Sequence, residues 1–198
     1  MNLFDTYQNL FARMDWLLFA FSVLLFFAGL ASAPLVIKKN IALLIKYPEW
    51  VYSVLKRYLE REKGFFSLFK LIFTLNALSL FLDFVSGWGV VFPFLLAYLT
   101  GLNIAIIAYK MGGSTGIITL ILNPVAFFEL PAAWFALTFG MQLSRVIWSG
   151  DGLAAVATQF KSGLDGFMYL TIPLLLLSGI IEAGMIAAFQ NNSDADIE

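Results

Sequence analysis

The sequence predicts an all-α membrane protein, a polytopic bundle of transmembrane helices in a single membrane domain over residues 1–198. Hydrophobic residues make up 61% of the chain and charged residues only 13%, whereas an average soluble domain has about 25% charged residues. The apolar residues form five long runs, each long enough as a helix to cross the roughly 30 Å hydrocarbon core. Charged residues collect between these runs, where they can reach water.

The chain starts with a short amphipathic helix, which we expect over about residues 2–14. Apolar side chains recur there at helical spacing, which is typical of a helix lying in the membrane interface; a frayed terminus is the alternative. The first span follows at residues 16–37, an uncharged run. The small residues at 31–33 imitate a signal-peptidase site, but Pro34 follows them and the preceding region is not basic. We therefore interpret the run as a retained span.

The connection between the first two spans, residues 38–64, is the most basic part of the chain. Its basic residues are Lys38, Lys39, Lys46, Lys56, Arg57, Arg61 and Lys63. This excess places the connection in the cytoplasm. We expect an amphipathic helix over about residues 48–63, because Pro48 suits a first helical turn and Gly64 suits a stop. This helix is predicted to rest on anionic headgroups, and docking of a cytoplasmic partner is the functional alternative.

The second and third spans are expected at residues 65–85 and 88–109, joined by a tight turn. Asn76 lies near the centre of the second span and needs a partner inside the bundle, because its short side chain cannot reach an interface. Asn103 lies in the third span close to Gly101, where we expect another helix to pack closely.

The fourth segment, residues 116–147, is too long for one straight span and contains two prolines. Pro124 and Pro131 flank Glu129, and we expect the helix to break or re-enter the membrane near residues 123–131. In the favoured interpretation a new helix begins at Pro131 and Glu129 lies beside its free amide groups. The alternative is one continuous, kinked helix.

The last span is expected at residues 167–189, after a polar loop that can carry a short helix at residues 153–160. Glu182 lies within this span, beside a ridge of small residues that lets another helix approach closely. The ridge consists of Gly179, Ala183 and Ala187. An acidic tail, residues 190–198, is expected to be disordered.

Five polar residues inside the spans could form an intramembrane network. They are Glu129, Glu182, Asn76, Asn103 and Asn123. One interpretation is a buried network that fixes helix register and subunit pairing without chemistry. The other is a proton-coupled or ion-coupled path lined by the two glutamates. Gln142 and Arg145 are further candidates to pair with these acids.

Composition argues against an enzyme. The chain has no cysteine and no histidine, so it lacks disulfides, a thiolate nucleophile, an imidazole base and the usual zinc ligands. Asp83 is the only aspartate inside a predicted span and lies near its end, which rules out an aspartyl dyad. We therefore expect no catalytic residue, no metal site and no cofactor. The net charge of −1 gives no reason to expect a nucleic-acid partner.

Several stretches resemble the stage II sporulation protein M family of membrane proteins. Residues 124–132 read PVAFFELPA and are similar to the family signature PHGxFELPA. Asn76 looks like an asparagine of that family, and residues 101–103 are loosely similar to its asparagine-glycine element. Residues 173–183, PLLLLSGIIEA, look like its closing segment.

The resemblance implies a helical integral membrane protein. In the best-known case the family member belongs to a membrane complex that remodels peptidoglycan during engulfment, where it scaffolds a hydrolase and is not the catalyst. Val125 and Ala126 stand where the family has histidine and glycine, so a role that needs an imidazole is not expected here.

Together these observations favour a non-enzymatic scaffold or complex subunit in the cell membrane. We expect it to span the lipid bilayer several times and to form a homo-oligomer, most simply a dimer, with other membrane or cytoplasmic proteins as further partners. A subunit of a transporter or channel that uses Glu129 and Glu182 is the alternative function.

Overall fold

The computed structural model describes residues 3–61 and 64–195, in which every regular element is a helix. Five helices are long and apolar enough to cross a membrane, which confirms the predicted all-α, multi-pass class. Three of the candidate spans are single helices, α2 (Trp16–Lys38), α5 (Phe92–Ile121) and α6 (Pro124–Ser149). The other two are composite: α4 (Phe65–Val85) continues into η1 (Ser86–Gly89), and α7 (Leu153–Gly166) continues through η2 (Phe167–Thr171) into α8 (Ile172–Ala195). The remaining elements are α1 (Leu3–Arg13) and α3 (Ala42–Arg61).

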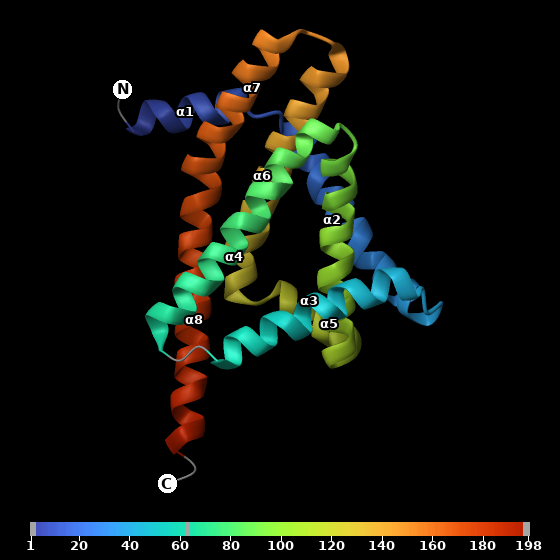
Figure 1. The fold of residues 1–198 in the computed structure, drawn as a ribbon, viewed down its shortest axis with the longest axis vertical. Coiled ribbons are helices and arrows are strands. Elements are labelled where there is room, and N and C mark those ends of the chain that lie inside the picture. The colour runs from blue at the N-terminus through green and yellow to red at the C-terminus, as the bar shows by residue number, and fades with distance from the viewer. Residues whose placement is uncertain (1–2, 62–63, 196–198) are drawn as a thin grey trace.

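The spans form two helix pairs with α6 between them (Figure 1). Helix α2 packs along α5, and α4 packs along α8, whereas α4 and α5 hardly touch each other. Helix α6 contacts all four and carries the largest set of buried residues. Helix α3 crosses one end of the bundle, and α1, η1 and α7 lie at the other end. The central position of α6 means that its polar residues decide where the bundle can hold a site.

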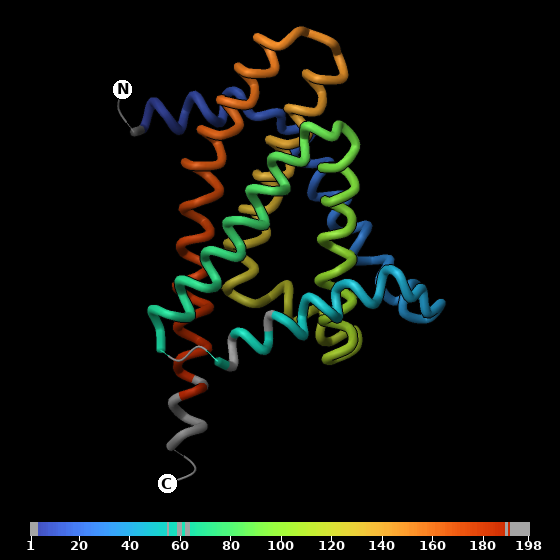
Figure 2. Tube along the Cα trace, in the orientation of Figure 1, coloured from blue at the N-terminus to red at the C-terminus, as the bar shows by residue number. Residues whose placement is uncertain are grey.

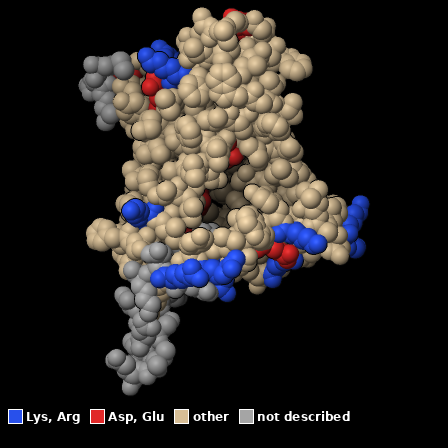
Figure 3. Space-filling model, viewed as in Figure 1, with Lys and Arg blue, Asp and Glu red and all other residues tan. Residues whose placement is uncertain are grey.

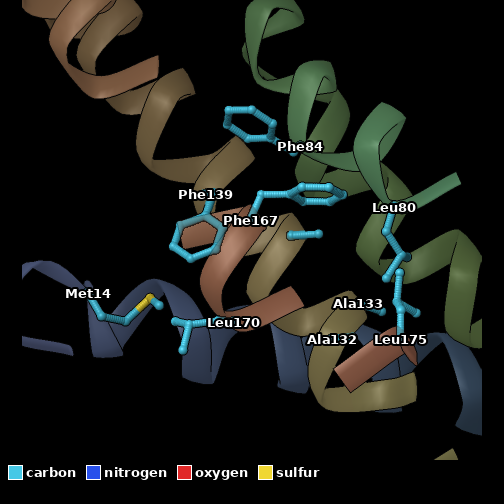
Figure 4. Close-up of a cluster of buried hydrophobic side chains, with 10 residues drawn as sticks. Met14, Leu80, Phe84, Ala132, Ala133, Phe139, Phe167, Leu170 and Leu175 are labelled. Atoms are coloured by element: carbon cyan, nitrogen blue, oxygen red, sulfur yellow. The ribbon is translucent and has the colours of Figure 1, made fainter. Parts of the chain in front are cut away.

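An aromatic core joins α4, α6 and the start of the last span (Figure 4). The rings of Phe84 and Phe167 lie 6.3 Å apart between centroids and are nearly parallel. Gly163 and Gly166 face the rings of Phe84 and Phe139, and a larger residue at either glycine would overlap the ring. Large rings on two helices therefore fit against small residues on a third, as close packing requires.

The α2–α5 pair approaches backbone to backbone. A Cβ atom on Gly29 would overlap the carbonyl oxygen of Tyr98, and one on Gly101 would overlap the carbonyl oxygen of Phe26. The Tyr98 hydroxyl and the Ser32 hydroxyl share a hydrogen bond of 2.7 Å next to this contact. The close packing expected at Gly101 is thus present, and its partner is α2.

Side-chain hydrogen bonds tie the η1 end of α6 to its neighbours. Gln142 donates through Nε2 to the carbonyl oxygen of Arg13 (3.1 Å), and Ser144 donates to the carbonyl oxygen of Gly87 (3.1 Å). The hydroxyls of Ser22 and Thr138 lie 3.4 Å apart between α2 and α6. These polar groups are buried, so the bonds remove a desolvation cost that would otherwise oppose folding.

Helix α3 starts earlier than the sequence suggested. It begins at Ala42, so Pro48 lies inside the helix and not in its first turn. The carbonyl that Pro48 leaves unpaired is that of Leu44. Pro48 is buried and Leu44 packs against the cluster of α2 and α5, so packing holds this part of the helix. Residues 62–63 of the predicted helix, and residue 2 of the predicted first helix, lie outside the described residues.

The last two helices are longer than predicted. Helix α7 continues to Gly166 and joins α8 through the π-helical turn η2, so the expected short helix at residues 153–160 is only its first part. Helix α8 extends to Ala195, which corrects the expected disorder for the first residues of the tail; residues 196–198 lie outside the described part. Helices α7, η2 and α8 follow one another without a gap. Each extra residue therefore extends an existing helix and does not require nucleation of a new one.

A glycine pair, and not a proline, ends the third span. Gly112 and Gly113 leave helical geometry, and Gly113 has φ +60° and ψ −145°, a conformation that favours glycine. The following residues, 114–121, fold back so that Gly116 lies against the backbone of Ala108. Figure 2 shows this reversal at the lower end of α5. The predicted fourth segment therefore started too early, because residues 116–121 belong to this reversal.

Asp15 caps the first span. Its Oδ1 atom accepts hydrogen bonds from the backbone N–H groups of Leu17 and Leu18, both at 3.0 Å, and Oδ2 forms an ion pair with Arg145. Partial burial raises the pKa of Asp15, but the hydrogen bonds from Leu18, Arg145 and Leu17 outweigh burial and leave the pKa below its ordinary value. The charged form is therefore the one that the folded chain prefers.

We expect Asp15→Ala to lower the free energy of unfolding by about 1 kcal/mol near neutral pH, the usual cost of a lost cap. Because the folded-state pKa is lowered, this stabilisation is present above the unfolded pKa of about 4 and is lost as the pH falls through the folded pKa. The difference in melting temperature between wild type and Asp15→Ala should shrink on acidification to about pH 3. Asp15→Asn keeps a capping oxygen without the charge, so a melting curve that follows wild type at every pH would contradict this account.

Candidate functional site

The site is built on the first turns of α6, where the structure corrects a prediction. Asn123 is the N-cap, and its side chain accepts a hydrogen bond from the N–H of Val125 at 3.0 Å. Pro124 follows as the first residue, where a proline costs no hydrogen bond. The helix then runs without a break through Pro131 to Ser149. The chain therefore breaks at Leu122 and Asn123, at the start of the predicted range 123–131, whereas the break expected at Pro131 is wrong.

A proline inside a helix deprives one carbonyl of its partner, here that of Phe127. Phe127 is 73% exposed, so this residue lies on the outer face of the helix and not in the core. Immediately after Pro131, Ala132 and Ala133 are buried against α8 and α4. Burial of these residues stabilises α6 beyond Pro131, so one lost hydrogen bond does not end the helix.

Glu129 is consequently the sixth residue of a continuous helix. The favoured prediction, that Glu129 lies beside the free amides of a helix beginning at Pro131, is wrong because Asn123 caps the helix instead. Counted at 1.5 Å per residue, Glu129 lies about 8 Å along the axis from Pro124. The carboxylate is thus inside the span, near the end of the bundle that α3 crosses.

Glu182 of α8 lies close to Glu129. Helices α6 and α8 pack against each other, and the two carboxyl groups are near enough for their charges to interact. Both side chains are half-buried. In residues 3–61 and 64–195 neither forms an ion pair or a side-chain hydrogen bond. The structure therefore brings together two like-charged groups without supplying an opposite charge.

The face of the molecule is hollowed above α3 (Figure 3). Acidic atoms reach this hollow, and basic atoms lie below it, along the end of the bundle that α3 crosses. The hollow lies between the α4–α8 pair and the α2–α5 pair, where α4 and α5 barely meet. Glu129 and Glu182 are half-buried acids of the spans in this half of the bundle. We refer to these two glutamates as the carboxylate site, and to the surface depression in Figure 3 as the hollow.

The predicted partners of the acids are used elsewhere. Gln142 donates to the backbone of Arg13, and Arg145 pairs with Asp15, both at the η1 end of α6. Sixteen residues separate Glu129 from Arg145, which is about 24 Å along one helix. Neither Gln142 nor Arg145 can therefore neutralise the carboxylate site.

The other members of the predicted network are dispersed. Asn123 serves as a helix cap. Asn76 on α4 and Asn103 on α5 are half-buried, and within the described chain neither has a side-chain hydrogen bond. Hydrogen bonds do not join the five residues into one network in this part of the chain.

The small-residue ridge of α8 is covered by the same chain. Ala183 is fully buried among side chains of α4, where Leu68 and Ile72 are its buried neighbours. Ala187 packs at the edge of this cluster, and the ring of Phe69 lies 3.4 Å from where a Cβ of Gly179 would be. The helix that this ridge admits is therefore α4 of the same molecule.

Two buried polar atoms were not anticipated. The indole Nε1 of Trp134 and the hydroxyl of Thr171 are buried without a hydrogen-bond partner in the described chain. Trp134 packs against the rings of Phe19, Phe26 and Phe27 of α2. Both residues lie in otherwise apolar runs, so their polar atoms were the one sequence feature that could have predicted a buried polar group at these positions.

Four apolar spans around a central fifth, α6, define a multi-pass integral membrane protein, with a pair of acids inside its spans. In the described ranges no group of three acidic, histidine or cysteine side chains could hold a metal ion. The family model described as stage II sporulation protein M matches residues 17–185. The chain belongs to this family, as the resemblance of residues 124–132 implied. Searches of curated proteins and of solved structures gave no match.

Proposed function

We propose that the chain is a non-enzymatic subunit of a membrane assembly in which another protein helix covers the carboxylate site. The observation that carries this proposal is the pair Glu129 and Glu182, half-buried at the depth of the spans and without an opposite charge in the described chain. The absence of cysteine and histidine from the sequence supports a role without catalysis.

The free energy of the two carboxylates depends on what fills the hollow. A single charged side chain in the centre of a bilayer costs roughly 2.5 to 3.5 kcal/mol by insertion scales, and a second charge of the same sign adds repulsion. Lipid tails offer neither hydrogen bonds nor charge. A covering helix with a basic or amide side chain would remove most of this cost, whereas the isolated subunit would keep it.

The covering helix belongs to a second copy of this chain or to another membrane protein. The ridge formed by Gly179, Ala183 and Ala187 does not provide that contact, because α4 already covers it. The hollow between the two helix pairs is the surface that remains open. With the basic end of the bundle in the cytoplasm, as the excess of lysine and arginine favours, the site faces the cytoplasmic half of the bilayer.

We expect the double variant Glu129→Gln/Glu182→Gln to weaken the assembly. In mild detergent, native mass spectrometry should find wild type with an associated subunit and should find at least a tenfold larger free fraction for the variant, which corresponds to about 1.4 kcal/mol. Asp165→Asn, an exposed acid of α7, is the matched control and should behave as wild type. A wild-type protein that is strictly monomeric and free of associated protein in both detergent and nanodiscs would contradict the proposal.

A second candidate function is favoured by the same pair of acids. If water fills the hollow, the carboxylates can bind and release protons or cations within the membrane, as acidic residues do in transporters. Reconstituted vesicles should then show a pH-dependent flux that is lost in Glu129→Gln. No flux of protons or of any tested cation by wild type would count against transport and leave the assembly role.

A further inference from the structure

The carboxyl-terminal half of α3 carries a cavity that the carboxylate site does not use. The cavity has a volume of about 360 Å³, and its described lining is Trp50, Val54, Arg57, Tyr58 and Arg61. Apart from the neighbours Arg57 and Tyr58, successive residues of the lining are three or four positions apart, so they share one face of the helix. A volume of this size lies within the range of ligand pockets, roughly 300 to 1,000 Å³.

The opposite face of α3 attaches the helix to the bundle. Ile45 is buried with residues of α2 and α5, and Glu49 forms an ion pair with Lys110 of α5. The hydrophobic contact and the ion pair hold the amino-terminal half of α3, whereas the cavity lies beyond them along the helix. The cavity face is therefore presented outward and not used for packing.

The two arginines give the cavity its chemistry. Arg57 donates through Nε to the carbonyl oxygen of Ser53 at 3.2 Å, which holds the guanidinium close to the helix and leaves its other N–H groups available. In residues 3–61 and 64–195 no carboxylate pairs with either arginine. Two guanidinium groups one helical turn apart can each offer a pair of parallel hydrogen bonds to phosphate oxygens.

The aromatic side chains indicate where the ligand comes from. Trp50 is 62% exposed and Tyr58 is 52% exposed, and these two residue types are enriched at the membrane–water interface. Helix α3 crosses the end of the bundle (Figure 1), and basic atoms line that end (Figure 3). The cavity therefore lies at the level of lipid headgroups.

We propose that this cavity binds the phosphate of an anionic phospholipid headgroup. Arg57 and Arg61 bind the phosphate oxygens, and Trp50 and Tyr58 pack against the glycerol and the first carbons of the acyl chains. Charge complementarity favours this occupant, because each basic residue near an anionic leaflet contributes about 1 kcal/mol and a guanidinium pair adds directed hydrogen bonds. Lipid binding at this cavity does not depend on what covers the carboxylate site.

The test measures lipid binding to the purified full chain by native mass spectrometry, with phosphatidylglycerol and phosphatidylcholine of identical acyl chains as probes. Wild type should bind phosphatidylglycerol at least tenfold more tightly, and Arg57→Gln/Arg61→Gln should lose that preference. Lys38→Gln/Lys39→Gln is the matched control, because it removes two charges from the same end of the bundle and outside the cavity lining. It should keep the preference.

Three outcomes would overturn the proposal. Equal binding of both lipids by wild type would remove the anionic specificity. An equal loss of preference in the lysine control would show that diffuse charge, and not a site, attracts the lipid. Displacement of phosphatidylglycerol by inorganic phosphate at the same concentration would assign the cavity to free phosphate. If the arginine variant fails to fold, Trp50→Leu provides the second variant and is expected to weaken phosphatidylglycerol binding while keeping both arginines.

Discussion

Replacement of Gly101 by alanine is expected to lower the free energy of unfolding by about 3 kcal/mol, the upper end of the usual cost of overpacking. The added methyl group would overlap the carbonyl oxygen of Phe26 and lie 2.8 Å from its carbonyl carbon. Backbone atoms of a helix cannot move aside as a flexible side chain does. Helices α2 and α5 would have to separate along their contact, where small residues permit the close approach.

The matched control for this prediction is Gly184→Ala. No atom lies within 4 Å of where a Cβ of Gly184 would be, so this substitution adds the same methyl group to a transmembrane helix without a clash. It should leave the melting temperature in detergent unchanged or raise it, since alanine favours a helix by about 1 kcal/mol over glycine. The tryptophan fluorescence of both variants reports the transition. A Gly101→Ala protein that melts together with wild type would refute the α2–α5 contact.

The spans and the close contact at Gly101 could be predicted because they depend on local signals. Hydrophobic length alone identifies a span, and the predicted second span, residues 65–85, coincides with α4 (Phe65–Val85). The amphipathic α1 follows equally from its side-chain periodicity, and the structure has it at Leu3–Arg13. Each of these features is decided by residues that are neighbours in the chain.

The fourth span could not be placed correctly because two helix-breaking signals compete there. The glycine pair at 112–113 breaks the helix, since Gly113 adopts positive φ, whereas Pro131 does not. Which signal prevails depends on packing: residues after Pro131 are buried between four helices, and burial compensates for one missing hydrogen bond. Propensity alone does not contain that information.

The sequence alone identifies the two acidic residues of the candidate site, but it does not predict that they lie near each other. Glu129 and Glu182 are conspicuous as acids in apolar runs. Their approach depends on the contact between α6 and α8, which are separated in sequence by α7 and η2. The distance to Arg145 follows more simply, because along a continuous α6 the helical rise alone puts Arg145 beyond reach of Glu129.

The proximity of the two glutamates leads to the second prediction with a large effect, a charge-reversal cycle. Glu129→Lys and Glu182→Lys each place opposite charges on α6 and α8, whereas the double reversal restores two like charges. We expect each single variant to be more stable in detergent than the double variant, with a coupling energy of about 0.5 to 3 kcal/mol, the range for interacting residues. Thermal unfolding of the four proteins in one detergent measures this coupling.

The same cycle distinguishes contact from a general effect of charge. Glu129→Lys combined with Asp165→Lys changes the same charges, but Asp165 lies on α7 at the other end of the bundle. These two substitutions should be additive within about 0.5 kcal/mol.

A single reversal also supplies the opposite charge that the site lacks, so Glu129→Lys should release the covering subunit as effectively as Glu129→Gln/Glu182→Gln does. Additive stabilities in the glutamate cycle would mean that the carboxylates do not face each other, and the carboxylate site would have to be abandoned.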